Sequence, residues 1–268
     1  MSGIVIGINP IIAQVGPFEL AWHAVLSMLA VLAAVLITGR LAKQKGIATE
    51  EIYSLAIWAI AGGIIGARLF HVLDHLGYYA ANPGQILQIQ LGGLAIWGAL
   101  IGGAVATIPY ARLKGLPLAR LVDVLAPALL VAQIIGRIGC TINGDAWGGI
   151  TSLPWGFIYT NPNDLIPVNL LGVPTHPYPV YEMIWNGIVL LVIWQLGRAF
   201  KKDGMKFMTY IALYSIGRFF LTFVRQETVL FWGLQEAQVV GLVGLAFSAC
   251  ALLYLSLQQP LPERPSQP

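Results

Sequence analysis

The sequence predicts an all-α integral membrane protein, and its composition and the length of its apolar runs are the observations behind this prediction. Of the 268 residues, 57% are hydrophobic and 10% are charged, and the mean hydropathy is +0.74. Soluble domains carry about 25% charged residues. The apolar runs are about 20 residues long, as membrane-spanning helices require, whereas barrel strands would be about 10 residues long with alternating polarity.

Seven apolar segments are long enough to span a membrane, and we expect them to form one polytopic domain over residues 1–268. The only long connection, residues 139–178, is rich in Gly, Pro, Asn and Thr. We expect it to form a small extracytoplasmic cap between the fourth and fifth spans. The predicted spans cover about 18–39, 52–73, 92–111, 121–138, 179–197, 207–225 and 236–257.

The distribution of cationic residues predicts that the N-terminus lies outside and the C-terminus inside. Eleven of the 15 Lys and Arg residues, including every lysine, fall in the loops at 40–45, 112–120 and 198–206 or in the tail at Arg264. The loops at 74–91 and 139–178 contain none. Cytoplasmic loops carry an excess of Lys and Arg. Since the cations are divided among separate loops, the net charge of +3 does not indicate nucleic-acid binding.

The four remaining cations are arginines within or near the outer ends of predicted spans: Arg68, Arg137, Arg218 and Arg225. A helix-centre arginine costs at least about 2.5 kcal/mol on insertion scales, so it is normally kept for a partner or a polar cavity. Guanidinium groups match phosphate oxygens in a bidentate manner. The four together therefore predict a phosphate-binding site, although each could instead pair with a local carboxylate or snorkel to headgroups.

Residues 136–156 join the fourth span to the cap and combine polar side chains with glycines. Arg137, Asn143, Asp145 and Trp147 are interleaved with the glycines at positions 136, 139, 144, 148 and 149. Glycine lets the backbone approach a ligand closely and form turns that other residues cannot make. The stretch predicts a pocket for an anionic group at the membrane surface, and the alternative is a snorkelling arginine followed by a glycine-rich turn.

A second polar stripe is predicted on the sixth span. On a helix, Tyr214, Arg218, Thr222 and Arg225 share one face, with Arg218 and Arg225 about 10 Å apart along the axis. Glu182, at the start of the fifth span, is the candidate counter-ion for one of the arginines.

No metal or organic cofactor is predicted. Cys140 and Cys250 lack the spacing of metal ligands. His71 and His75 are four residues apart, but no third ligand is evident nearby. His176, before the fifth span, could act as a base, or it could be a loop residue that caps the helix.

Five segments, in this order, resemble the phosphatidylglycerol–prolipoprotein diacylglyceryl transferase family. They are G-G-L-A-I-W-G-A-L-I-G (92–102), G-R-I-G-C-T-I-N-G-D-A-W-G (136–148), L-P-W-G (153–156), H-P-Y-P-V-Y-E (176–182) and G-R-F-F-L-T-F-V-R (217–225). The resemblance implies seven spans in a bacterial cell membrane, with the active site toward the outer leaflet. It also implies transfer of the diacylglyceryl group from phosphatidylglycerol to the lipobox cysteine of a preprolipoprotein.

The resemblance implies roles for particular residues. Arg137 and Arg218 would handle the phosphate as catalytic residues, and Asn143 and Asp145 match the signature loop. The residues implied to bind phosphatidylglycerol are Arg137, Arg68, Arg225, Tyr214, Gly148, Glu182 and Trp97.

The chain departs from the best-known members of the family at four positions. Trp97 stands where those members carry a histidine that is a candidate base. Cys140 stands where members often have an asparagine, and Thr222 stands where they often have a glutamate. His23 stands in place of a tyrosine of the first span. His23 and His176 are therefore the remaining candidates for a base. These departures leave two alternatives open: a non-catalytic paralogue that binds lipid or lipoprotein, and an anion transporter whose arginines form a permeation site.

Overall fold

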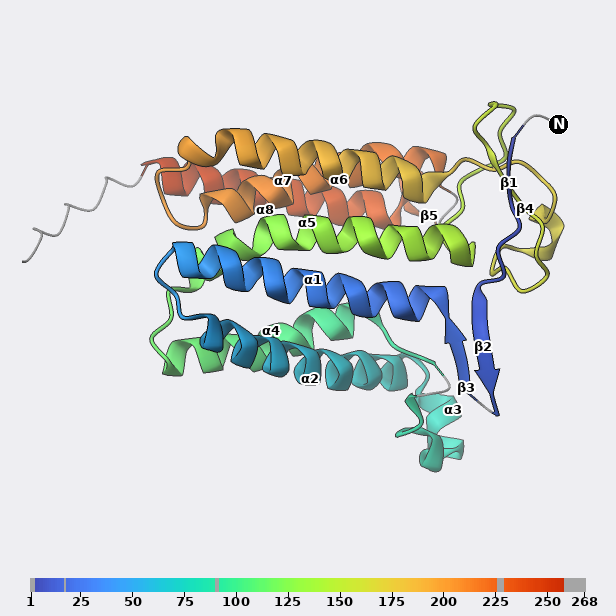
Figure 1. Ribbon diagram of the computed structural model, residues 1–268, viewed down its shortest axis with the longest axis horizontal. Helices are drawn as coiled ribbons and strands as arrows, with labels where there is room; N and C mark the ends of the chain where they lie inside the picture. The colour runs from blue at the N-terminus through green and yellow to red at the C-terminus, as the bar shows by residue number, and fades with distance from the viewer. Residues whose placement is uncertain (1–2, 17, 90–91, 226–228, 258–268) are drawn as a thin grey trace, which may run out of the picture. The chain divides into compact units, whose positions relative to one another are not determined.

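The computed structural model describes residues 3–16, 18–89, 92–225 and 229–257, and within them seven long helices follow the predicted spans. Arg264, which was assigned to the inner tail, lies outside the described residues. The long helices (Figure 1) are α1 (Trp22–Gln44), α2 (Thr49–Asp74), α4 (Ile96–Leu113), α5 (Leu118–Asn143), α6 (Tyr178–Gln195), α7 (Met205–Leu221) and α8 (Glu236–Leu257).

Among the described residues, six of these helices are long and apolar enough to cross a membrane: α1, α2, α4, α5, α7 with the 3₁₀ turn η5 (Thr222–Val224), and α8. The remaining predicted span, the fifth in chain order, corresponds to α6, which carries the buried polar side chains of Glu182 and Asn186. The structure therefore confirms the predicted class, an all-α membrane protein built of apolar helices.

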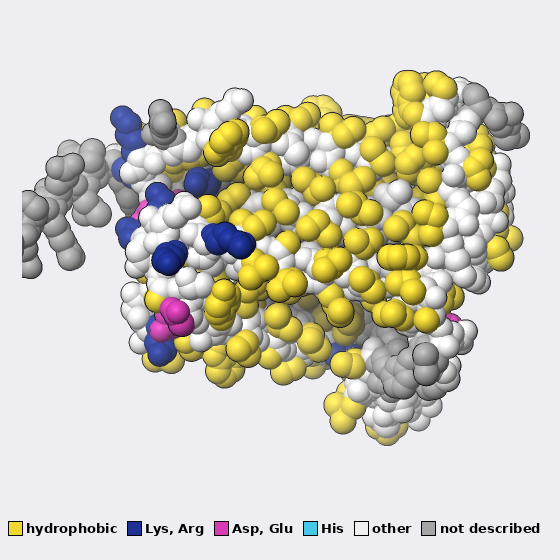
Figure 2. Space-filling view, viewed as in Figure 1, with side chains coloured by type: hydrophobic (Ala, Val, Ile, Leu, Met, Phe, Trp, Pro, Cys, Tyr) yellow, Lys and Arg dark blue, Asp and Glu magenta, His cyan; other side chains and the backbone are white. Residues whose placement is uncertain are grey.

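The sides of the helices expose large hydrophobic side chains rather than polar ones. Examples are Met28, Ile57, Ile65, Val105 and Phe247, each at least 63% exposed. In the face shown in Figure 2, hydrophobic side chains cover the helix flanks, and most of the Lys and Arg side chains in view lie at helix ends. This pattern is inverted relative to a soluble protein and suits helices surrounded by lipid.

Two compact units make up the chain, one of residues Val35–Val124 and the other of Met1–Ala34 with Leu125–Pro268. In the first unit, the short helix α3 (Leu76–Ala81) and the 3₁₀ turn η1 (Pro83–Gln85) connect α2 to α4. In the second, α7 packs against both α6 and α8, and η4 (Leu196–Arg198) follows α6. A core of Ala126, Leu130, Val189, Ile193 and Tyr210 joins α5, α6 and α7.

Helices α2 and α4 cross at glycines that are four residues apart on each helix. A Cβ atom on Gly66 would lie 2.2 Å from the Gly98 carbonyl oxygen, and one on Gly102 would lie 2.2 Å from that of Gly62. The backbones therefore touch directly, as small residues allow in membrane helices.

The connection between α5 and α6 begins later than predicted, because α5 continues to Asn143, and it contains structure shared with the N-terminal segment. Strand β4 (Phe157–Tyr159) pairs in parallel with β1 (Ile4–Ile6). The connection also contains the 3₁₀ turn η3 (Val168–Leu170). Elsewhere in the chain, two antiparallel hairpins are formed, one by β2 (Ile11–Val15) with β3 (Phe18–Ala21) and the other by β5 (Val229–Phe231) with β6 (Leu234–Gln235).

Tyr159 links the connection between α5 and α6 to the last turns of α5 through a hydrogen bond. Its buried hydroxyl donates a hydrogen bond to the Thr141 carbonyl oxygen at 3.0 Å. Burial, helped by the neighbouring carboxylates of Asp164 and Asp145, raises the pKa of Tyr159 above its usual value. The hydroxyl therefore keeps its proton and remains a donor throughout the physiological pH range.

We expect the Gly66→Ala substitution to lower the free energy of unfolding by about 1–3 kcal/mol, because the added methyl group would separate two backbones that touch. The change is measured as the melting temperature in detergent. Gly63→Ala is the matched control on the same helix: its Cβ would lie 3.5 Å from the Ala99 carbonyl oxygen, an ordinary contact. Equal melting temperatures for the two variants would contradict the role assigned to Gly66.

Candidate functional site

A buried carboxylate, that of Glu182 on α6, pairs with two arginines from neighbouring helices. Arg137 on α5 contacts its Oε2 through Nε, and Arg218 on α7 contacts its Oε1 through Nη1 at 3.0 Å. The Glu182 side chain is 5% exposed, and those of Arg137 and Arg218 are 23% and 20% exposed. The predicted counter-ion thus serves two arginines rather than one.

Tyr178, one turn before Glu182 on the same helix, completes the cluster. Its hydroxyl donates to Glu182 Oε1 at 3.1 Å and accepts a hydrogen bond from Arg218 Nη1. The guanidinium carbons of Arg137, Arg218 and Arg225 lie 6.0, 5.9 and 5.0 Å from the centre of its ring. At these distances the ring face attracts cations.

Tyr178 lies within the motif H-P-Y-P-V-Y-E, but no role was predicted for it from the sequence. The available signal was its position four residues before Glu182, which places both side chains on one face of a helix.

Arg225 reaches the cluster by a route that the sequence did not predict. The expected helical stripe from Tyr214 to Arg225 is wrong at its end, because α7 ends at Leu221 and the backbone at Arg225 is extended. Arg225 instead forms an antiparallel bridge with Gly148. The estimate of 10 Å along a helix axis therefore does not apply to Arg218 and Arg225.

Gly148 occupies a position where no side chain fits. An added Cβ would lie 2.6 Å from His176 Cβ and 2.7 Å from the Val224 carbonyl oxygen. The neighbouring Gly149 amide donates to the same Val224 oxygen at 2.7 Å. Close backbone packing thus explains this glycine and fixes the segment that carries Arg225.

A cavity of about 210 Å³ opens beside the cluster. It brings together four residues that the sequence singled out, namely Arg137, Glu182, Tyr214 and His23, and four that it did not assign to the site. The latter are Gln133, Gly136, Cys140 and Asn186. Since Asn186 lies four residues after Glu182, the periodicity of α6 could have revealed it.

The two candidate bases occupy different places. His23, near the start of α1, lines the cavity, and its Nδ1 lies 4.0 Å from Cys140 Sγ. His176 is not among the cavity-lining residues; its Nδ1 lies 3.2 Å from the Tyr181 hydroxyl, and its backbone pairs with Gly148 and Gly149. These contacts are those expected of a loop residue before a helix.

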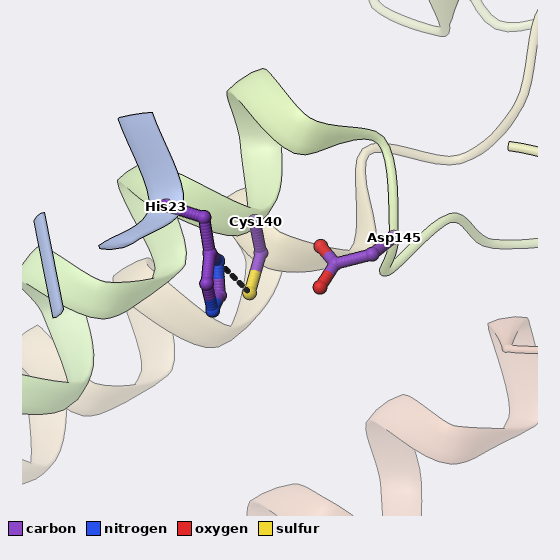
Figure 3. Close-up of side chains that lie close together, drawn as sticks. All are labelled: His23, Cys140 and Asp145. Atoms are coloured by element: carbon purple, nitrogen blue, oxygen red, sulfur yellow. Dashed lines mark hydrogen bonds between the residues drawn. The ribbon is translucent and has the colours of Figure 1, made fainter. Parts of the chain in front are cut away.

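Asn143 and Asp145 stand where α5 ends. The Asn143 carbonyl oxygen accepts a hydrogen bond from the Leu165 amide at 2.9 Å, which ties the helix end to the following connection. Gly144 has a φ of +70°, and the resulting turn directs Asp145 back toward the helix. The Asp145 carboxylate faces the sulfur of Cys140 (Figure 3).

Arg68 and Trp97 belong to the compact unit of residues Val35–Val124. Arg68 is buried and donates to five backbone carbonyls, those of Gln85, Ile86, Gln88, Gly92 and Gly93. The described structure therefore gives Arg68 a clear role in ordering the connection before α4. Trp97, on α4, is 46% exposed.

Apolar helices around a polar cavity and a cluster of partly buried arginines define an integral membrane protein with the features of an anion site. Residues 10–254 match the family model described as "Prolipoprotein diacylglyceryl transferase", so the chain belongs to that family. The resemblance recognised in the sequence motifs is thereby confirmed.

Individual relatives agree with this assignment over nearly the whole chain. A protein of Nostoc sp. named "Phosphatidylglycerol--prolipoprotein diacylglyceryl transferase" is 36% identical, over 95% of this chain and 92% of its own. Proteins with the same name from Clostridioides difficile and Lysinibacillus sphaericus are 37% and 34% identical, over 89% and 95% of this chain and 92% and 94% of their own.

We expect Glu182→Gln to lower the free energy of unfolding by about 3–5 kcal/mol, because it leaves two largely buried guanidinium groups without their shared carboxylate. Phosphatidylglycerol in mixed micelles should restore part of the melting temperature, since its phosphate can replace the lost charge.

The matched control for this prediction is Glu51→Gln. The pair between Glu51 and Lys114 is 3.8 Å long and its side chains are 27% and 51% exposed, so the expected loss is below about 1 kcal/mol. Equal losses in the two variants would contradict the central role of Glu182.

Proposed function

We propose that this protein transfers the diacylglyceryl group of phosphatidylglycerol to the lipobox cysteine thiol of a prolipoprotein. The thiol sulfur attacks the carbon of the diacylglyceryl group that carries the phosphate ester, a carbon–sulfur bond replaces the carbon–oxygen bond, and the headgroup leaves as glycerol phosphate. Family membership and the names of the relatives support the proposal. The observation that carries it is the pair of arginines, Arg137 and Arg218, held on one carboxylate at a cavity.

Arg137 and Arg218 would stabilise the leaving phosphate. Negative charge accumulates on the phosphate as the carbon–oxygen bond breaks, and fixed cations in a dry site stabilise such charge strongly. Each guanidinium has five N–H donors, so the contacts with Glu182 leave others for phosphate oxygens. Glu182 and Tyr178 would hold both groups in place before the lipid arrives.

The remaining residues have supporting parts in the proposal. Arg225 and Tyr214 would contact the phosphatidylglycerol headgroup, and Gly148 would let the backbone approach it. Asn143 and Asp145 would act in the signature loop at the end of α5. For Arg68 and Trp97, in the other compact unit, lipid binding is proposed from the resemblance alone.

We assign the base that accepts the thiol proton to His23 rather than His176. His23 lines the same cavity as Arg137, whereas His176 pairs with Tyr181 and is not among the cavity-lining residues. The substrate brings its own thiol, so Cys140 is not required as a nucleophile.

The proposal includes an orientation in the bacterial inner membrane. The N-terminus would lie outside and the C-terminus inside, α6 would also cross the membrane and bring the number of spans to seven, and residues 1–268 would form one polytopic domain. The active site would then face the outer leaflet, where a preprolipoprotein signal peptide presents its cysteine. The uneven distribution of Lys and Arg among the loops supports this orientation.

The deciding experiment is a transfer assay with purified protein, phosphatidylglycerol and a lipobox peptide. Mass spectrometry should show the peptide gaining one diacylglyceryl group. Arg137→Ala and Arg218→Ala should each lower the rate at least about 100-fold, as loss of a charge-stabilising donor does in other enzymes.

Arg40→Ala is the matched control for the transfer assay, because Arg40 is an exposed arginine at the other end of α1 from His23. Its rate should equal that of the unmodified protein. No mass gain by the unmodified protein, with phosphatidylglycerol still bound, would instead support the non-catalytic lipid-binding alternative.

His23→Ala should abolish transfer while leaving phosphatidylglycerol binding intact, and added imidazole should restore part of the rate by entering the vacated space. His176→Ala, which removes the other candidate, should keep most of the activity. Both variants are tested in metal-free buffer with the same mass-spectrometric readout. The opposite result would move the base to His176.

A further inference from the structure

His23, Cys140 and Asp145 form a cluster of three metal-binding side chains within the second compact unit. Each offers one ligand atom, an imidazole nitrogen, a thiol sulfur and a carboxylate oxygen, and these atoms lie within 4.8 Å of one another. Figure 3 shows the three side chains converging from α1, from α5 and from the turn after α5.

Backbone features of the chain bring the cluster together. Gly139 lacks a side chain where His23 of α1 lies against α5: an added Cβ would lie 3.2 Å from His23 Cα and 3.3 Å from its Nδ1. The turn at Gly144 then returns Asp145 to the same place. The three ligand atoms thus come from rigid helix positions and a constrained turn rather than from mobile surface side chains.

One atom of the cluster has no hydrogen-bond partner among the described residues. Asp145 Oδ1 is buried and accepts no hydrogen bond. A buried polar atom without a partner is energetically unfavourable, and a charged one is more so. A bound cation would supply the missing partner.

The donor set selects the kind of metal. Nitrogen and sulfur ligands suit Zn²⁺ and related transition-metal ions, whereas Ca²⁺ and Mg²⁺ require oxygen ligands. Ligand atoms of a tetrahedral zinc site lie about 3.5 Å apart, given bonds of about 2.0–2.3 Å. His23 Nδ1 and Cys140 Sγ, at 4.0 Å, need only a small rotation to reach that separation.

We propose that His23, Cys140 and Asp145 bind a single Zn²⁺ ion and that this binding reversibly inhibits the protein. The cavity beside His23 and Cys140 leaves room for a water molecule as the fourth ligand. The inhibitory part rests on the proposed transferase function, because a zinc ion on His23 would occupy the nitrogen that is needed as a base. It would also lie beside Arg137, whose Nη1 is 3.6 Å from Cys140 Sγ.

Zinc binding itself is tested without any activity. Chelator-treated protein lacking a polyhistidine tag is titrated with ZnCl₂ by calorimetry in detergent, and one ion per chain is expected. Co²⁺ added in place of Zn²⁺ should produce the absorption of a thiolate–cobalt bond. Cys140→Ser should weaken zinc binding at least tenfold and abolish that absorption.

Cys250→Ser is the matched control, since Cys250 is a free, exposed cysteine and Cys140 is free and buried. It should leave the stoichiometry, affinity and cobalt spectrum unchanged. Asp145→Ala provides a second variant that keeps the thiol and should also weaken zinc binding, and thermal melting verifies that each variant is folded. Unchanged zinc affinity in folded Cys140→Ser, or no binding by the unmodified protein, would overturn the site.

Inhibition is measured separately with the transfer assay, each variant being compared with its own zinc-free rate. Micromolar Zn²⁺ should stop transfer by the unmodified protein, and Cys140→Ser should require at least ten times more. If zinc binds and transfer is unaffected, the inhibitory role is wrong although the site stands. If calorimetry succeeds and no transfer occurs at all, the proposed function fails and the zinc site does not.

Discussion

The ion pairs of Glu182 with Arg137 and Arg218 are the interaction on which the candidate site depends. Two guanidinium groups can stay at the ends of apolar helices because one buried carboxylate neutralises part of their charge, and Tyr178 adds a hydrogen bond and its ring face. A third arginine, Arg225, lies near the same tyrosine, with its guanidinium carbon 5.0 Å from the centre of the Tyr178 ring. A site of this kind holds its cations in position and still attracts a phosphate.

Close backbone contacts make this arrangement possible. Glycine at position 148 lets the segment after α7 come near enough for Arg225 to reach the ring of Tyr178, and Gly139 brings His23 against α5. Elsewhere in the chain, α2 and α4 also make a direct backbone contact, at Gly66 and Gly98. In a membrane, where burial of apolar surface drives helix association only weakly, such contacts contribute much of the packing energy.

The cavity beside the cluster combines two kinds of chemistry. Its lining includes Arg137, which suits a phosphate ester, and also His23 and Cys140, which suit proton transfer or a soft metal ion. In this chain His23 and Cys140 stand where the sequence resemblance implies a tyrosine and often an asparagine. The proposed zinc site depends on these two residues, because imidazole and thiolate groups bind zinc better than phenol and amide groups do.

The sequence by itself determined the apolar helices and most of the charged residues of the site, because hydrophobic run length and an arginine in an apolar run are local signals. The stripe from Tyr214 to Arg218 was also readable, but Arg225 was misplaced since helix periodicity cannot show where α7 ends. Only the tertiary structure decided that Glu182 pairs with two arginines, that Tyr178 lies among three, and that Arg68 binds backbone carbonyls. It alone also joined His23 to Cys140 and Asp145, because ligands separated by more than 100 residues leave no spacing pattern to recognise.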